Sequence, residues 1–175
     1  MRALSPNWFA LRPIVFAPPL PEMPVDQPAI VQSASALLAA KARLSLSHRI
    51  NAHIGVLYAT RDVPNIALFQ NAIEELGGQV SVACPSLDNP DSHKTEEMVR
   101  LLGRLYTAIE CVDLDPTFVN CIRTVAGIPA FEGLSTEKHW VARAVTQVSG
   151  NDSIQAKRQA LIQAYLLAMM PRQGR

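Results

Sequence analysis

The side chains best placed to do chemistry lie beside one predicted helix, which spans residues 66–76. A helix N-terminus favours an anion, because its first backbone N–H groups are free and the helix dipole is positive there. Asp62 precedes this helix, and its carboxylate can satisfy those N–H groups itself. Pro64 removes another backbone donor. A small anion would need cations from elsewhere in the fold, and the candidates are Arg61, His93, Lys94 and His139.

The three cysteines, Cys84, Cys111 and Cys121, are odd in number and widely spaced. They form no C-x-x-C pair and have no histidine cluster near them, so we expect neither a zinc site nor a disulfide framework. We therefore expect no metal and no cofactor. Free thiols fit a reducing cytoplasm.

The composition is that of a compact protein with one domain. The 175 residues are 49% hydrophobic and 18% charged, and the formal net charge is +1. Duplex binding needs clustered Lys and Arg, and no basic block is present, so we expect no nucleic-acid partner. No run approaches the roughly 18 apolar residues of a membrane span, so we expect neither an anchor nor a signal peptide.

Residues 1–28 are predicted to form an extended arm, because their proline content forbids a continuous helix. Trp8, Phe9 and Phe16 would be costly to leave in water, so the arm is expected to pack on its own domain or on a neighbouring subunit. A disordered tail is the alternative. The prolines are Pro6, Pro13, Pro18, Pro19, Pro21, Pro24 and Pro28.

The rest of the chain alternates between helical and strand patterns. Apolar periodicity predicts helices over residues 29–44, 66–76, 95–106 and 116–126, and strands over 54–58, 79–83, 108–112 and 129–131. This alternation predicts an α/β fold, a three-layer sandwich around a parallel sheet of about four strands. A long helix over 154–170 ends at Pro171. We divide the chain into the arm (1–28), one domain (29–148), and a link with a C-terminal helix that packs back on that domain (149–175).

Several motifs, in order and without gaps, resemble the aspartate/ornithine carbamoyltransferase family. Gly55-Val-Leu-Tyr58 and Ala72-Ile-Glu-Glu-Leu-Gly-Gly78 resemble its first strand and helix, and Arg100-Leu-Leu-Gly-Arg104 resembles its Arg-Val-Leu-Ser helix. Ala126-Gly-Ile-Pro129, Gly133-Leu134 and His139 match its Ser-x-Pro, Asn-Gly-Leu and His-Pro-x-Gln signals. The resemblance covers residues 29–145 and implies the N-terminal, carbamoyl-phosphate-binding domain. Residues 154–170 resemble the family's final helix, which implies that a short link replaces the amino-acid-binding domain.

The family's phosphate-binding residues are not retained. Its Ser-Thr-Arg-Thr-Arg sequence is matched here by Asp62, Val63, Pro64, Asn65 and Ile66. Each arginine would supply charge-assisted hydrogen bonds of roughly 1.5–3 kcal/mol. Asp62 instead repels a phosphate, by roughly 4 kcal/mol per pair of unit charges about 4 Å apart at an effective dielectric near 20.

Other departures point the same way. Val112 stands where the family has a further arginine, and Trp140 and Ala142 replace its Pro and Gln. His139 alone remains of the groups that polarise the carbamoyl carbonyl. Lys94 lies in a segment that, in the family, reaches a neighbouring subunit's site, although a solvated lysine is the simpler interpretation. Arg61 precedes the helix, where a surface or ion-pair role is the simpler one.

These departures predict a non-catalytic, carbamoyltransferase-like pseudoenzyme that acts as an assembly or partner-binding domain, with no catalytic residues. The alternative is that it binds carbamoyl phosphate or another small anion or metabolite, as a sensor or as an accessory subunit, with Arg61, Lys94 and His139 as residual ligands. The resemblance implies a homotrimer with a place in amino-acid metabolism.

Overall fold

The computed structural model describes residues 25–42, 50–59, 66–84 and 92–170. Residues 1–24 of the predicted arm lie outside the described residues, as do residues 61–65 and the side chain of His93. None of the described helices is long and apolar enough to cross a membrane.

Four parallel strands form the central sheet: β1 (His53–Tyr58), β2 (Gln79–Ala83), β3 (Ala108–Val112) and β4 (Ala130–Glu132). Their order is β2-β1-β3-β4, so β1 and β3 occupy the middle. Near-continuous apolar runs are typical of parallel strands that are covered on both faces. Every residue of β3 is buried, whereas β2 is partly exposed along its length. The predicted α/β class with a four-stranded parallel sheet is confirmed.

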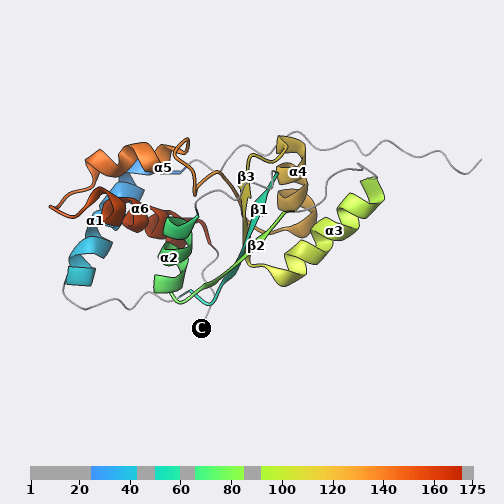
Figure 1. Cartoon of the computed structure of the whole chain (residues 1–175), viewed down its shortest axis with the longest axis horizontal. Coiled ribbons are helices and arrows are strands. Elements are labelled where there is room, and N and C mark those ends of the chain that lie inside the picture. The colour runs from blue at the N-terminus through green and yellow to red at the C-terminus, as the bar shows by residue number, and fades with distance from the viewer. Residues whose placement is uncertain (1–24, 43–49, 60–65, 85–91, 171–175) are drawn as a thin grey trace, which may run out of the picture.

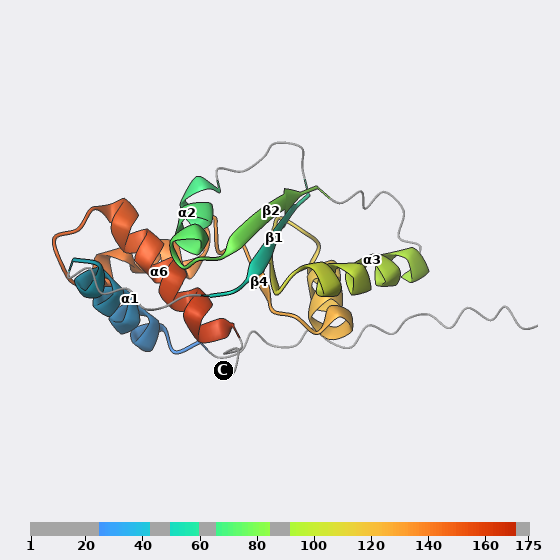
Figure 2. The ribbon, with the colours of Figure 1, turned by 90° about the horizontal axis from the view of Figure 1, so that it is seen from below.

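Helices cover both faces of this sheet, as Figure 1 shows and as Figure 2 shows from below. Ile54 and Val56 of β1 belong to one hydrophobic core, and Leu57 and Ile109 belong to the other. The predicted three-layer sandwich is therefore confirmed. The first face carries α1 (Gln27–Ala42), α2 (Ala67–Glu75), α5 (Trp140–Arg143), η2 (Ala144–Gln147) and α6 (Ile154–Met169). The second carries α3 (Ser92–Leu105), α4 (Pro116–Cys121) and η1 (Ile122–Ala126).

The helix predicted over residues 116–126 changes form partway along. The Asp115 carboxylate caps its start by accepting from the Thr117 backbone N–H at 2.8 Å. The α-helix ends at Cys121 and continues as the π-helical turn η1. In that turn the Thr124 hydroxyl donates to the Asn120 carbonyl oxygen at 2.9 Å. This side-chain hydrogen bond competes with the regular helical ladder at the point where the helix changes form.

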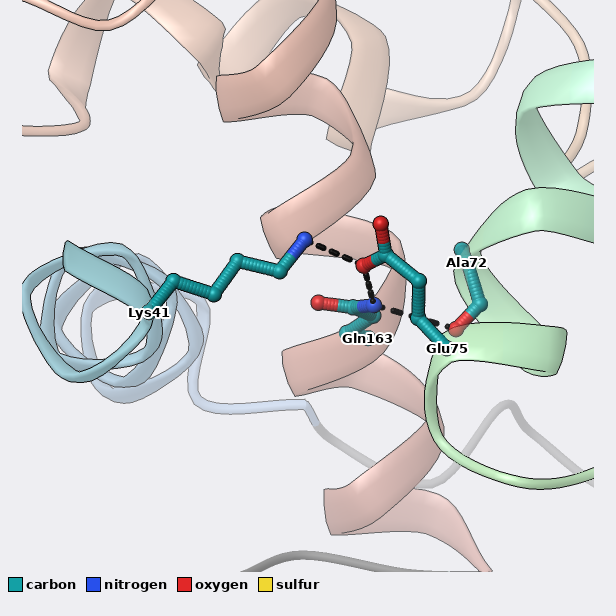
Figure 3. Close-up of polar contacts among 4 residues, drawn as sticks. All are labelled: Lys41, Ala72, Glu75 and Gln163. Carbon is teal, nitrogen blue, oxygen red and sulfur yellow. Dashed lines mark hydrogen bonds and ion pairs between the residues drawn. The ribbon is translucent and has the colours of Figure 1, made fainter. Parts of the chain in front are cut away.

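Helix α6 packs against α1 and α2, and it buries one polar side chain between them. The Gln163 amide Nε2 donates to the Ala72 carbonyl oxygen at 3.1 Å and to Glu75 Oε2 at 2.9 Å. The Lys41 ammonium pairs with the same carboxylate oxygen, so one carboxylate links three helices (Figure 3). Burial alone would raise the pKa of Glu75, but the hydrogen bonds from Lys41 and Gln163 lower it below its ordinary value. Its contribution to stability is therefore present above pH 4.5 and is lost as the pH falls below that value.

We expect the Gln163→Leu variant to unfold about 1–3 kcal/mol more easily at neutral pH, because it leaves Glu75 and the Ala72 carbonyl without their buried donor. The matched control is Gln155→Leu, since Gln155 is exposed on the same helix and its loss should change stability by less than about 0.5 kcal/mol. Chemical denaturation measures both free energies of unfolding. If both substitutions lowered the free energy of unfolding by the same amount, the hydrogen bonds of Gln163 would contribute nothing specific to stability.

Candidate functional site at the carboxyl edge of the sheet

The carboxyl ends of the parallel strands bring several chain segments to one edge of the sheet, where ligands of open α/β folds usually bind. β1 ends at Tyr58, β3 is followed by Asp113, and β4 is followed by residues 133–139. Asp113 has a positive φ of 52°, so the chain turns sharply as it leaves β3. Residues 60–65 and 85–91, which follow β1 and β2, lie outside the described part.

His139 lies at the end of this edge, where it caps α5. Its Nδ1 accepts from the Val141 backbone N–H at 3.3 Å, so the ring proton of the neutral imidazole is on Nε2. The ring meets Tyr165 edge-on, with the centroids 5.5 Å apart, and lies 5.8 Å from the ring of Trp140. Burial, with a smaller effect of Arg143, lowers the pKa of His139 to about 4. At neutral pH this side chain offers one N–H donor and no positive charge.

Two positions that the sequence resemblance matches to arginines of the family are core positions here. Ile66 is 5% exposed and Val112 is 3% exposed, and both belong to the hydrophobic core on the α6 face of the sheet. Ile66 is also the residue at which α2 begins, and it makes no side-chain cap. The other predicted members of the degenerate phosphate site, Asp62, Val63, Pro64 and Asn65, lie outside the described residues, as does Arg61.

Two of the cations described near this edge pair with carboxylates, and a third, Arg143, is exposed and acts on His139. Lys138 Nζ lies 3.3 Å from Asp113 Oδ1, and the Arg158 guanidinium pairs with Glu137. Lys94, a predicted residual ligand, is exposed in the first turn of α3. Helices α3 and α5 cover opposite faces of the sheet, so Lys94 and His139 come from different layers (Figure 1).

Sequence reasoning missed a buried carboxyl group beneath the same edge. Glu110 lies in the middle of β3 and is fully buried, and its Oε1 accepts from both the backbone N–H and the hydroxyl of Ser135, at 2.9 and 2.8 Å. A signal was present, because Glu110 is the one charged residue in an otherwise apolar strand. The partner is 25 residues away, and no local pattern indicates it.

A second polar contact that the sequence does not reveal lies at the opposite end of the sheet. His53 Nε2 and the Ser81 hydroxyl are 2.7 Å apart, and the His53 ring meets Tyr106 edge-on. No carboxylate among the described residues hydrogen-bonds to His53, so the pair lacks the acidic member of a catalytic triad. We interpret it as a link between β1 and β2.

The cysteines are not gathered into a site. Cys111 and Cys121 are buried, Cys84 is exposed, and burial raises the pKa of Cys111, which keeps this thiol protonated. No group of three or more His, Cys, Asp or Glu residues in the described ranges could hold a metal ion.

We expect the His139 ring to remain neutral from pH 7 down to about pH 5, with a titration midpoint near 4, because its protonation is opposed by burial and by Arg143. An unfolded histidine takes up its proton near 6.5, so the free energy of unfolding should fall as the pH drops from 6.5 towards 4. NMR of the imidazole nitrogens measures the midpoint. The His139→Asn variant keeps a capping acceptor and should lose this pH dependence. A midpoint at the ordinary histidine value would contradict the buried, uncharged assignment.

Comparison with known proteins found the same fold in carbamoyltransferases of solved structure. No family model and no curated protein matches the sequence. The structure is similar to ornithine carbamoyltransferase from Burkholderia thailandensis E264, with a TM-score of 0.54 and 13% identity over 69% of this chain and 42% of that one. A putative aspartate carbamoyltransferase from Trypanosoma cruzi gives a TM-score of 0.51 and 13% identity over 81% of this chain and 56% of the other. A variant of N-acetyl-L-ornithine transcarbamylase, complexed with carbamyl phosphate and N-succinyl-L-norvaline, gives 0.52 and 17%, over 72% and 44%.

These likenesses are at the level of the fold, and they confirm the resemblance predicted from the sequence motifs. The chain spans less than two thirds of the length of the solved proteins that it matches.

Proposed function

We propose, from the premise that this chain has a carbamoyltransferase-like fold, that it is a non-catalytic domain that acts in assembly. The observation that carries this proposal is the burial of Ile66 and Val112 in the apolar core. In the family that the sequence resembles, both positions hold arginines that bind the phosphate. A buried anion needs paired charges to offset its desolvation, and two aliphatic side chains supply none.

The remaining polar groups at the edge do not replace those arginines. His139 uses Nδ1 to cap α5 and is uncharged at neutral pH. Lys138 is held by Asp113, and Arg158 by Glu137, so an anion would have to compete with a carboxylate for either cation. These contacts favour a domain that keeps the carbamoyltransferase-like fold but does not bind the phosphate.

Transfer of a carbamoyl group to an amino acid also requires a binding site for that amino acid, and the connection between η2 and α6 bears on this requirement. Only residues 148–153 connect η2 to α6, which packs directly on α1 and α2. The sequence resemblance places the substrate-binding domain of the family between the corresponding elements. A link of this length leaves no room for a domain there, which supports the non-catalytic proposal.

The assembly function has a candidate surface on α3. Leu101 and Leu105 lie one helical turn apart and are 51% and 52% exposed. Large apolar side chains that adjoin one another on a surface are typical of interfaces. The occupant that we assign is a second copy of this chain, because the resemblance implies a trimer and a net charge of +1 gives little repulsion between copies.

Calorimetric titration with carbamoyl phosphate, and separately with inorganic phosphate, tests the non-catalytic proposal. We expect no binding tighter than a Kd of about 100 μM, which corresponds to roughly 5.5 kcal/mol. The N-acetyl-L-ornithine transcarbamylase variant, whose complex with carbamyl phosphate has been solved, is the positive control. Tighter binding of carbamoyl phosphate would overturn the proposal in favour of an anion-binding sensor or accessory subunit.

Light scattering tests the assembly surface. We expect the native chain to have about three times its monomer mass of 19.1 kDa. The Leu101→Glu/Leu105→Glu variant should be monomeric, because two carboxylates would be desolvated in the interface. Gln155→Glu adds a charge at an exposed position of α6, on the other face of the sheet, and is the matched control. A monomeric native chain would contradict assembly, and an intact trimer of the double variant would contradict the α3 surface.

A further inference from the structure

The Glu110 carboxyl group is hydrogen-bonded on one side only. Its Oε1 accepts two hydrogen bonds from Ser135, but its Oε2 is buried and has no partner among the described residues. β1 and β4 flank it in the sheet, where Val56 and Phe131 are its register partners. An unpartnered buried oxygen costs about 1–3 kcal/mol, and more if the group is charged. The ionised form of Glu110 is therefore strongly disfavoured while this arrangement lasts.

The charged neighbours do not relieve that cost. On β4, the Glu132 carboxylate opposes ionisation, although Arg123 pairs with it at 2.7 Å. On α6, Arg158 is already held by Glu137 and by the Ser135 carbonyl oxygen at 3.2 Å. Burial raises the pKa of Glu110 to about 8, while the Ser135 hydrogen bonds act in the opposite direction. Cys111, next to it in β3, belongs to the core on the other face of the sheet. Other titratable groups on the elements of the Glu110 layer include Tyr58 at the end of β1, Tyr165 on α6, His139 before α5, and Arg143 in α5.

Residues 133–139 follow β4 and carry Ser135, the hydrogen-bond partner of Glu110. Gly133 has a φ of 69° and donates its N–H to the Cys111 carbonyl oxygen at 2.9 Å. The Thr136 hydroxyl and backbone N–H both donate to the Gly133 carbonyl oxygen, at 2.7 and 2.8 Å. Glu137 and Lys138, only two and three residues beyond Ser135, are exposed. Leu134 of this loop is 1% exposed in the core, so opening of the loop must also withdraw this side chain before water reaches Oε2, whereas the flanking strands are held by the sheet ladder.

We propose that Glu110 and Ser135 form a proton-dependent latch, in which the neutral carboxyl group holds the 133–139 loop against β3 and ionisation favours its release. The loop ends at His139, the cap of α5. Release therefore changes the surface at the carboxyl edge of the sheet, and a partner that binds there would respond to pH. This inference does not depend on whether the chain assembles or binds an anion.

The direction of the pH effect follows from proton linkage. In the open loop the carboxyl group is hydrated and ionises near its ordinary value of 4.5, whereas in the closed loop it keeps its proton up to about pH 8. Between these values the open form binds fewer protons, so the opening equilibrium constant should rise about tenfold per pH unit. Above about pH 8 both forms are ionised, and the constant should level off.

Amide hydrogen exchange measured by NMR between about pH 5 and 8 tests the latch. Base-catalysed exchange alone gives a slope of about one in a plot of log rate against pH, and proton-linked opening adds about one more. We expect a slope near two for the amides of Gly133, Ser135 and Thr136, with an opening free energy below that of Ile109 in β3. Glu110→Gln keeps an acceptor for Ser135 but cannot ionise, so its slope should be near one.

A second variant keeps the test independent of the first. Ser135→Ala removes one hydrogen bond that favours the carboxylate, so the steep region should extend to higher pH than in the native chain. A slope of one for the native loop amides would overturn the latch. Loop amides that exchange at the same opening free energy as Ile109 would also overturn it, because the opening would then be global unfolding.

Discussion

Strands β1 and β3 lie in the middle of the sheet with helices packed on both faces, so each of their side chains must be apolar or must find a partner inside the protein. The five residues of β3 are all buried, and four of them meet this condition with small or aliphatic side chains or a thiol. The fifth residue, Glu110, meets it through Oε1, which accepts two hydrogen bonds from Ser135. β4 and the loop that follows it are hydrogen-bonded to β3. The arrangement of the carboxyl edge therefore depends on how the side chains of β3 are accommodated.

The same constraint applies at the carboxyl edge of the sheet. Where the family that the sequence resembles has arginines, Ile66 and Val112 extend the apolar core up to the end of the sheet. A core that fills this region gains roughly 1.5–3 kcal/mol for each large aliphatic side chain that it buries. Lys138 and Arg158 near this edge are paired with carboxylates. The apolar core thus occupies both of these positions.

Helix α6 completes the layer that encloses Glu110 and His139. Its buried residues pack on α1 and α2, and Gln163 satisfies two acceptors of α2 from within the interface. Tyr165 of the same helix lies against His139 and Phe131, so α6 also fixes the aromatic surroundings of the carboxyl edge. The short connection of residues 148–153 makes this arrangement possible, because it brings α6 straight back to the domain.

The sequence by itself determined the class of fold, since apolar runs of strand length alternate with amphipathic helices, and that local pattern gave the bounds of β2 and β3 and the sheet of four parallel strands. It also indicated the carbamoyltransferase-like motifs, and it has Ile66 and Val112 where the family that it resembles has arginines. The sequence did not predict the π-helical form of η1, because a Thr124 hydroxyl that bonds to a backbone carbonyl leaves no periodic signal. The tertiary structure alone decided that Glu110 would be buried with a raised pKa, that His139 would cap α5, and that the Glu75 carboxylate would link three helices. Each of these depends on burial and on partners distant in sequence, and a local pattern carries information about neither.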